Sequence, residues 1–245
     1  MCGLRPGQRM LVAGLDGCRV GWVLATAPAL ESGVTLQPGD LQVGVVTDLR
    51  EVVRRLNDGD LAAAAIDIPI GLAPDGPRPV DREARRRIGE RRSSVFPAPV
   101  RSVLAAQSYA DACAISRSVC ARGVSRQLFA ILDKIREVDE LESPALQDRL
   151  FEMHPEVSFT ELAGAPMRFH KSTDEGRNER LDALRRAFPG HALDAVTGER
   201  LRGAQPDDVL DALVGAWTAG RYVARRHVQL GGDVDGTGLR MEMIA

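Results

Sequence analysis

The stretch that decides the fold is MLVAGLDGCRVGWVLATA, residues 10–27. Its apolar run over 10–15 has the length and flanks of a buried strand, and residues 17–21 form a tight turn before Trp22 opens a second strand. Asp16 ends the first strand, although Asp is a poor strand former. On these residues alone, Asp16 is explained equally well as a cap of its own turn and as a functional carboxylate.

The next segment continues with a strand, a helix and another strand. Residues 41–47 alternate in hydrophobicity as a third strand does, and Asp48 can cap a helix that runs to Leu56. The apolar run 61–68 is a fourth strand, and it carries one carboxylate, Asp67, near its end. An aspartate therefore stands near the end of both the first and the fourth strand.

The middle of the chain changes to loops rich in proline and arginine, and then to helices. Residues 72–149 are predicted to be a helical insertion between the fourth and fifth strands, with one helix over 102–120 and a second that begins near Ser125. We expect this insertion to pack over one end of the sheet. The whole chain, 1–245, is predicted to be a single α/β domain.

The last third of the chain holds the remaining elements. Residues 150–154 are predicted to be the fifth strand, and Pro206 at a first-turn position opens a closing helix. Two capping-box patterns, Ser158 with Glu161 and Ser172 with Glu175, each predict the start of a helix. A glycine-rich loop from Gly231 leads to a short final strand.

Composition excludes several classes of protein. With 245 residues and 44% hydrophobic content, the chain can bury a packed core. No apolar segment approaches the ~20 residues that span a bilayer, and the N-terminal apolar run is too short for a signal peptide. We therefore expect no membrane partner and a cytoplasmic location. The four cysteines have neither zinc-site nor disulfide spacing and are expected to be free thiols.

The charges argue against a surface that binds nucleic acid throughout. The net charge is −2, whereas phosphate binding depends on clustered positive charge. Of the 32 basic residues, only Lys134 and Lys171 are lysines, so the number of arginines carries little weight and the two lysines stand out. Lys134 is more simply explained as a helix-surface ion pair with Glu137.

The closing helix adds a group of carboxylates. Asp207 and Asp208 lie in its first turn, where acidic residues suit the helix dipole. Asp211 is past that turn and at the border of the apolar stripe, so the dipole explains it less well. Asp208 and Asp211 are three residues apart and are therefore neighbours on the helix surface.

Three separate elements thus offer carboxylates, namely Asp16, Asp67, and Asp211 with Asp208. Carboxylates that converge repel one another unless a cation lies between them, and hard oxygen ligands suit Mg²⁺ or Mn²⁺. Two such ions about 4 Å apart would activate a water and stabilise the leaving oxygen in phosphodiester hydrolysis. Sequence alone does not show that the three elements meet.

Seven segments carry a resemblance that runs in order through nearly the whole chain. They are GLDGCRVGW (14–22), AIDIPIGL (65–72), the D-x-x-A-R…GERRSSVFPAPVR block (81–101), GVSRQLFAILDKIREVD (123–139), EMHPEVSF (152–159), KSTDEGRNERL (171–181) and DDVLDALVGAWTA (207–219). With these segments the chain resembles an uncharacterised family, domain of unknown function 429, whose members are described as predicted RNase H-like nucleases.

The resemblance implies an RNase H-like fold, a five-stranded mixed sheet with three antiparallel strands and then parallel strands, flanked by helices. In that superfamily the metal-binding acids come from the first strand, the end of the fourth strand and the closing helix, which match Asp16, Asp67 and Asp211. The D-A-L-V-G-A sequence from Asp211 is similar to the closing helix of Holliday-junction resolvases, which implies Asp208 as a fourth ligand or positioning group. Those resolvases have Glu where this chain has the shorter Asp67.

Further residues are expected near these acids. Glu156 is a candidate metal ligand, and His154 either positions a water or phosphate or is a satisfied histidine before a proline. Lys171 is a candidate phosphate contact together with the amides of Ser172 and Thr173, because helix N-termini attract anions. Arginines on a helix are commonly solvated, but three are candidates for contacts with backbone phosphates: Arg91, Arg92 and Arg101.

Three functions are open at this point. The first is a metal-dependent nuclease or phosphodiesterase that acts on nucleic acid or a nucleotide-like phosphodiester. The second is a phosphotransferase or nucleotide hydrolase related to actin and sugar kinases, although that superfamily duplicates the domain and this chain has room for one copy. The third is a non-catalytic binding module, which the net negative charge suggests. The sequence does not give the substrate or the oligomeric state, with a dimer among the options.

Overall fold

The computed structural model describes residues 10–29, 39–198 and 200–245, and these residues form two sheets. The larger sheet has five strands in the order β3-β2-β1-β4-β5. Its strands are β1 (Leu11–Cys18), β2 (Gly21–Pro28), β3 (Gln42–Val46), β4 (Leu61–Ile66) and β5 (Leu150–Glu152). The first three pair antiparallel, whereas β4 pairs parallel with β1, and β5 pairs parallel with β4. The predicted five-stranded mixed sheet is confirmed.

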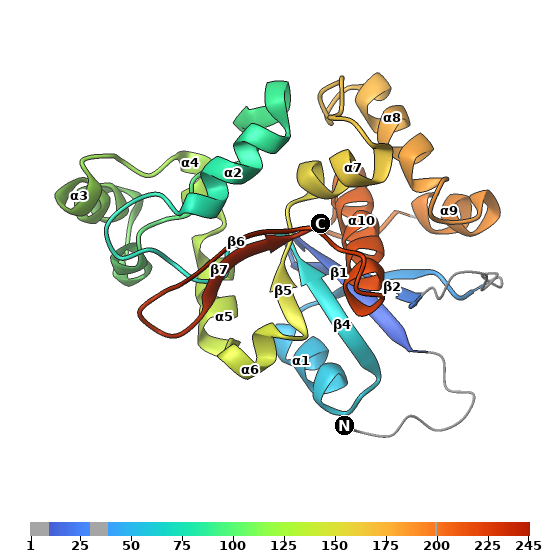
Figure 1. The fold of residues 1–245 in the computed structure, drawn as a ribbon, viewed down its shortest axis with the longest axis horizontal. Coiled ribbons are helices and arrows are strands. Elements are labelled where there is room, and N and C mark those ends of the chain that lie inside the picture. The colour runs from blue at the N-terminus through green and yellow to red at the C-terminus, as the bar shows by residue number, and fades with distance from the viewer. Residues whose placement is uncertain (1–9, 30–38, 199) are drawn as a thin grey trace.

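Helices cover both faces of this sheet (Figure 1). On one face lies α1 (Leu49–Asn57), which buries Leu56 in the same core as Leu15 of β1. Asp48 caps α1, as predicted, because its side chain accepts a hydrogen bond from the amide of Arg50 at 2.9 Å. The helices of the other face are α7 (Pro155–Ala163), α8 (Asp174–Leu184), α9 (Gly190–Thr197) and α10 (Pro206–Val223).

The closing helix α10 lies directly against β1. A Cβ at Gly14 would clash with the carbonyl oxygen of Ala212, and a Cβ at Gly215 would lie 3.0 Å from the Cα of Gly14. Backbones can approach this closely only where side chains are absent. Because side chains alternate along a strand, Asp16 shares the helix-facing side of β1 with Gly14. The glycine contact therefore brings the first half of α10 beside Asp16.

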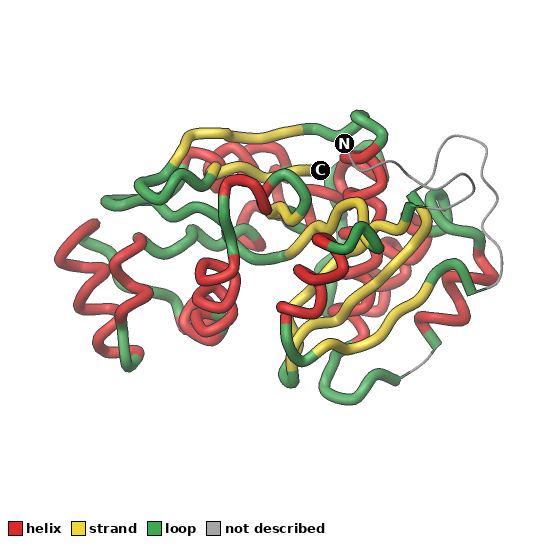
Figure 2. Tube along the Cα trace, turned by 90° about the horizontal axis from the view of Figure 1, so that it is seen from below, coloured by secondary structure: helices red, strands yellow, loops and turns green. Residues whose placement is uncertain are grey.

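Between β4 and β5 the chain forms only helices and loops, and Figures 1 and 2 show them as a group beside the sheet. These segments are α2 (Pro79–Arg87), η1 (Gly89–Ser94), η2 (Arg101–Ala105), α3 (Tyr109–Cys120), α4 (Arg126–Ala130), α5 (Leu132–Leu141) and α6 (Pro144–Gln147). The α5 helix joins the core on the α1 face of the sheet. The insertion thus packs beside the strand ends, where the carboxylates lie.

The second sheet is a hairpin of β6 (Gln229–Val234) and β7 (Arg240–Ile244). The prediction placed a loop from Gly231 onward, and β6 was missed. Gly231 and Gly232 both have positive φ, and the pairing register shifts beside them, so this strand contains a bulge rather than a regular alternation. The hairpin shares a core with α2, and it therefore supports the insertion.

Two predicted helices of the insertion are each divided in two. The helix expected over 102–120 is interrupted, because Ser108 caps a new start for α3 by accepting a hydrogen bond from the amide of Asp111. The helix expected from Ser125 is divided at Ile131 into α4 and α5. The apolar stripe continues across that break, and for this reason periodicity alone does not reveal it.

Both capping-box predictions were wrong in position. Ser158 lies inside α7, whose N-cap is His154, and Pro155 takes the first helical position. The N-cap of α8 is Thr173 rather than Ser172. Thr173 and Ser172 are adjacent hydroxyl residues, and the pattern could not decide between them.

Among the described residues, no helix has both the length and the apolar character needed to cross a membrane. Cys18, Cys113 and Cys120 are free thiols, and Cys2 lies outside the described residues.

Candidate functional site

A cavity of about 560 Å³ lies where the ends of β1, β4 and β5 meet α10. One wall comes from the edge of the sheet and from α10, and includes Asp16, Asp67 and Asp211. The insertion supplies another wall, made of Arg78, Arg91, Ser93, Ser94, Val95, Phe96, Gln127, Leu128, Ile131 and Lys134. The site is thus enclosed between the sheet and the insertion.

Strand pairing places Asp67 beside Asp16. Leu15 and Ile66, the residues that precede them, are partners in the parallel register of β1 and β4. The amide of Asp67 donates a hydrogen bond to the carbonyl oxygen of Leu15 at 3.0 Å. Because parallel strands deliver their carboxyl ends to the same edge of a sheet, both side chains reach the cavity.

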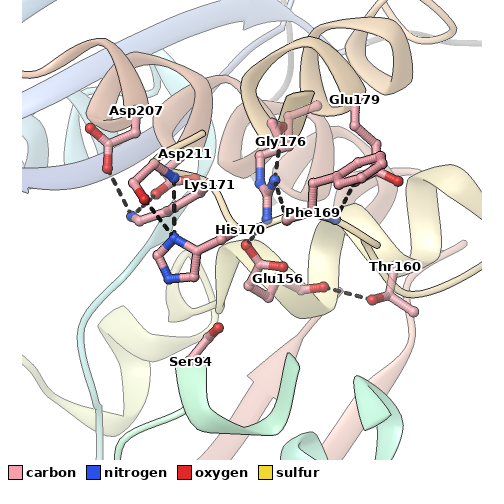
Figure 3. Close-up of polar contacts among 12 residues, drawn as sticks. Ser94, Glu156, Thr160, Phe169, His170, Lys171, Gly176, Glu179, Asp207 and Asp211 are labelled. Carbon is pink, nitrogen blue, oxygen red and sulfur yellow. Dashed lines mark hydrogen bonds and ion pairs between the residues drawn. The ribbon is translucent and has the colours of Figure 1, made fainter. Parts of the chain in front are cut away.

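Asp211 is brought to the same place by α10. Its side chain is 1% exposed, and one oxygen accepts a hydrogen bond from the ammonium group of Lys171 at 2.8 Å. Its other oxygen, Oδ1, is buried without a hydrogen-bond partner. Lys171 also pairs with Asp207 at 3.2 Å, so this ammonium lies between two carboxylates of α10 (Figure 3).

Ser172 and Thr173 do not offer their amides to an anion, contrary to the prediction. The amide of Ser172 donates to the Nδ1 atom of His170 at 3.3 Å, and the amide of Thr173 donates to the carbonyl oxygen of His170 at 3.0 Å. These two donors are already used by the turn that precedes α8. Lys171 therefore points into the group of carboxylates rather than toward a phosphate site at this helix start.

The carboxylates raise one another's pKa values. Burial raises the pKa of Asp16 well above its ordinary value, and the charges of Asp211, Asp67 and Asp208 raise it further. Burial also raises the pKa of Asp67, and it raises the pKa of Asp211 to about 6 although Lys171 opposes this shift. The site therefore holds more negative charge than it can easily keep without a further cation.

Among the described residues, no group of three His, Cys, Asp or Glu side chains is arranged to hold a metal ion as it stands. Asp208 contributes to the capping box of α10, since it accepts a hydrogen bond from the amide of Gln205 at 2.7 Å. Burial raises its pKa as well. The structure thus gives Asp208 a role at the helix start in addition to its charge near Asp16.

Glu156 and His154 lie at the start of α7, directly after β5. Glu156 is buried, its Oε1 atom pairs with the buried guanidinium of Arg180, and its Oε2 atom has no partner. The Nδ1 atom of His154 accepts a hydrogen bond from the amide of Glu156, so the proton lies on Nε2, which is 3.3 Å from the carbonyl oxygen of Ser94. Both nitrogens of His154 are therefore satisfied within the protein.

Lys134 was missed by sequence reasoning, and its predicted ion pair with Glu137 is wrong. Its ammonium donates to the carbonyl oxygen of Gly21 and lies 4.3 Å from the centre of the Trp22 ring. Glu137 instead accepts hydrogen bonds from the indole of Trp22 and from the amide of Leu49, both at 3.1 Å. Both side chains tie α5 to the β1–β2 hairpin.

A signal for Lys134 was present in the composition. Lys134 and Lys171 are the two lysines of a chain with 32 basic residues, and both line the cavity. Burial lowers the pKa of Lys134, and the charge of Asp16 is among the influences that oppose this shift. An ammonium differs from a guanidinium as a compact point charge, so the two lysines mark the site.

The three predicted arginines are placed differently. Arg91 lines the cavity, whereas Arg92 is exposed and is not part of its lining. Arg101 pairs with Asp139 at 3.0 Å and with Asp235 at 2.6 Å, and it does not line the cavity either. Arg92 and Arg101 are therefore not brought to the site. The lining residues that the sequence analysis did not name as candidates include Ser93, Ser94, Phe96, Gln127 and His170.

Fold and site together define an α/β protein with a carboxylate-lined cavity between a mixed sheet and a helical insertion. The family model described as "Protein of unknown function (DUF429)" matches residues 14–235, and the chain belongs to this family. The matched range includes Asp16, Asp67 and Asp211. No curated protein and no solved structure matches the chain.

Proposed function

We propose that this protein is a divalent-metal-dependent phosphodiesterase or nuclease with an RNase H-like fold. The observation that carries the proposal is the surplus of buried carboxylate at the cavity. Asp16, Asp67 and Asp211 come from three separate elements; after burial, the charges of Asp211 and Asp67 raise the pKa of Asp16, and the charge of Asp67 raises that of Asp211. Such a surplus destabilises a fold unless a cation or a ligand compensates for it, and it is therefore costly to keep for structure alone.

The chemistry of the donors fits Mg²⁺ or Mn²⁺. Carboxylate oxygens are the ligands that these hard ions prefer, and two such oxygens, Oδ1 of Asp211 and Oε2 of Glu156, are buried without a partner. We assign Asp16, Asp67 and Asp211 as the residues that would hold the cation, with Asp208 and Glu156 beside them. When bound, such an ion would supply an activated water and stabilise the leaving oxygen of a phosphodiester.

In this proposal Lys171 has one role in the metal-free site and a different role when a metal ion is bound. Its ammonium pairs with Asp211 and Asp207, so a cation at Asp211 competes with it for the same oxygens. Displaced from Asp211, Lys171 would be free to contact a phosphate oxygen of the substrate. Lys134 and Arg91 add positive charge on the insertion side of the cavity, where they would orient the same phosphate.

The RNase H-like assignment is supported by where the acids occur. They lie near the end of the first strand, directly after the fourth strand and in the closing helix, and the sheet has three antiparallel strands followed by two parallel ones. Nucleic acid, or a nucleotide-like phosphodiester, is the substrate class that this assignment implies.

Hydrolysis assays test the proposal. Protein freed of metal with a chelator would be assayed on bis(p-nitrophenyl) phosphate and on oligonucleotides, without metal and with Mg²⁺ or Mn²⁺. We expect activity only with metal, and a loss of about 100-fold or more in Asp16→Asn, Asp67→Asn and Asp211→Asn. Asp182→Asn is the matched control, because Asp182 is an exposed partner of Arg185 on α8. Metal-dependent activity that survives all three site substitutions would refute the assignment.

Thermal unfolding separates the alternatives. We expect Mn²⁺ to raise the melting temperature of the native protein and to have little effect on Asp16→Asn. Stabilisation by Mg-ATP without phosphodiester hydrolysis would favour the phosphotransferase reading instead. A protein with neither metal-linked stabilisation nor turnover would be the binding module.

A further inference from the structure

We infer that the cavity takes a single nucleotide unit, with its phosphate at the carboxylates and its base against Phe96. The inference rests on the proposed phosphodiesterase function and narrows its substrate. The enzyme would act on a nucleotide ester or on the terminal nucleotide of a single strand, and not on the interior of a duplex.

The insertion closes the site at two points. The Nε2 atom of His154, at the end of β5, lies 3.3 Å from the carbonyl oxygen of Ser94 in the insertion. On the other side, Lys134 of α5 donates to the carbonyl oxygen of Gly21 in the hairpin turn. The carboxylates therefore lie in a partly open cavity between the sheet and the insertion.

The size and charge of the cavity suit a small ligand. Its volume of about 560 Å³ falls within the roughly 300–1,000 Å³ of pockets that bury most of a small ligand. A duplex is bound by clustered positive charge along its phosphates, whereas this chain has a net charge of −2. Arg78 also lines the cavity but is paired with Asp81 and Glu152, and the other lysine and arginine side chains there, Lys134, Lys171 and Arg91, suffice for one or two phosphates.

Phe96 is the residue that indicates a flat, apolar group in the ligand. Its side chain is 42% exposed although it lines the cavity, and the preceding residue, Val95, is buried and anchors the segment. Aromatic residues make up only 4% of the chain, so an exposed ring at this position is not explained by abundance. An exposed aromatic ring beside basic side chains is a platform on which a base can stack.

The two walls of the cavity carry different kinds of side chain. Carboxylates come from the sheet edge and α10, and Lys171 comes from the turn before α8, whereas Phe96, Leu128 and Ile131 come from the insertion. Arg91 and the two serines that follow, Ser93 and Ser94, add polar groups on the insertion side. A ligand with a charged phosphate and a ring matches both walls, whereas a bare sugar phosphate would leave the apolar wall without a partner.

A binding experiment tests the role of Phe96 without turnover. Thymidine 5′-monophosphate and deoxyribose 5-phosphate would be titrated by calorimetry into wild-type protein with Mn²⁺. We expect the nucleotide to bind more tightly, and Phe96→Ala to weaken its binding by about 5- to 150-fold, the equivalent of losing one base stack. Phe96→Trp should retain binding. Equal affinity for nucleotide and sugar phosphate would overturn the inference.

Phe169→Ala is the matched control for Phe96→Ala. Phe169 has nearly the same exposure, 41%, but it does not line the cavity and its ring lies 5.3 Å from the guanidinium of Arg168. We expect this variant to bind thymidine 5′-monophosphate as the wild type does. An equal loss in both phenylalanine variants would overturn the assignment of Phe96.

A choice of substrates tests the need for a nucleotide end. We expect turnover of thymidine 5′-monophosphate p-nitrophenyl ester, and also of a linear single-stranded oligonucleotide if chain ends are a source of the nucleotide unit. We expect closed circular single-stranded DNA to be cleaved at least about 100-fold more slowly than the ester. Equal cleavage of circular and linear strands would overturn the inference while leaving the proposed phosphodiesterase intact. Absence of hydrolysis of every substrate would instead refute the proposed function, and the calorimetric comparison would still decide on the nucleotide.

Discussion

Two groups of charged side chains lie at the same cavity and are paired to different degrees. The first, which we call the closed cluster, is made of Arg78, Asp81 and Glu152. The second, the open cluster, is made of Asp16, Asp67, Asp207, Asp211 and Lys171. Both contain carboxylates near the ends of neighbouring strands, so position alone does not separate a structural group from a functional one.

In the closed cluster every carboxylate oxygen has a donor. The guanidinium of Arg78 contacts Asp81 at 2.6 Å and Glu152 at 2.7 Å, and it also donates to the carbonyl oxygens of Ile70 and Gly71. The second oxygens of the two acids accept hydrogen bonds from backbone amides. Such complete pairing offsets part of the cost of burying charge, although burial still raises the pKa of Glu152 to about 7 against the opposing charge of Arg78, and it joins the insertion to β5.

In the open cluster the pairing is incomplete. Lys171 offers one positive charge to Asp207 and Asp211, and Oδ1 of Asp211 has no partner. Asp16 gains one hydrogen bond, from the amide of Gly17 at 2.9 Å. A surplus of acids with unused oxygens, and not burial of acids as such, therefore marks a place for an external cation or ligand.

The largest effect is expected from breaking the closed cluster. Arg78→Met removes the partner of two buried carboxylates and should lower the free energy of unfolding by about 3–5 kcal/mol, measured by urea denaturation. Arg185→Met is the matched control, since Arg185 pairs with Asp182 and Asp194 at the surface and should change stability by at most about 1 kcal/mol. Similar losses in the two variants would show that the closed cluster is not a stabilising network.

An intermediate effect is expected from Glu142, a half-buried acid outside both clusters. Its Oε1 atom has no partner, and burial raises its pKa to about 8. In the unfolded chain its pKa is near the ordinary 4.5, so the stability contributed by protonated Glu142 is complete below pH 4.5 and is lost as the pH rises through about 8. Glu142 thus has an unpartnered oxygen, as Asp211 does. Without companion acids, this oxygen affects stability but does not form part of a binding site.

Glu142→Gln tests this interpretation. We expect the variant to equal the wild type near pH 4 and to exceed it by about 1–3 kcal/mol at pH 9, because glutamine does not ionise. Urea denaturation across this pH range measures the difference. A wild type whose stability at pH 9 matches that of the variant would mean that Glu142 ionises in the folded protein without cost.

The sequence predicted the elements that depend on local pattern and missed those that depend on distant contacts. The β1–β2 hairpin and the start of α10 at Pro206 follow from apolar periodicity and a first-turn proline, and they carry Asp16 and Asp211. Lys134 was assigned to the helix surface because its true partners, Gly21 and Trp22, are more than a hundred residues away in sequence.

At the strand ends, too, a physical reason separates what could be predicted from the sequence from what could not. The acids at the ends of β1 and β4 could be named in advance, since each is the one carboxylate of an apolar run. The insertion was expected to pack over one end of the sheet, but which of its residues face the acids could not be named, because its contacts at His154 and Lys134 arise from packing between distant segments. Phe96 follows the same rule, since its exposure is a property of the folded cavity.

The smallest effect on stability, and the sharpest test of the comparison, is expected from Asp16. Asp16→Asn removes a charge that the neighbouring acids repel, so metal-free protein should gain up to about 1 kcal/mol of unfolding free energy or show no change. Asp81→Asn, the same substitution in the closed cluster, should instead lose about 1–3 kcal/mol, because it weakens a charged hydrogen bond to Arg78. Urea denaturation with a chelator present measures both. A loss of 2 kcal/mol or more in Asp16→Asn would mean that this carboxylate mainly caps its own turn through the amide of Gly17, and that the open cluster is structural after all.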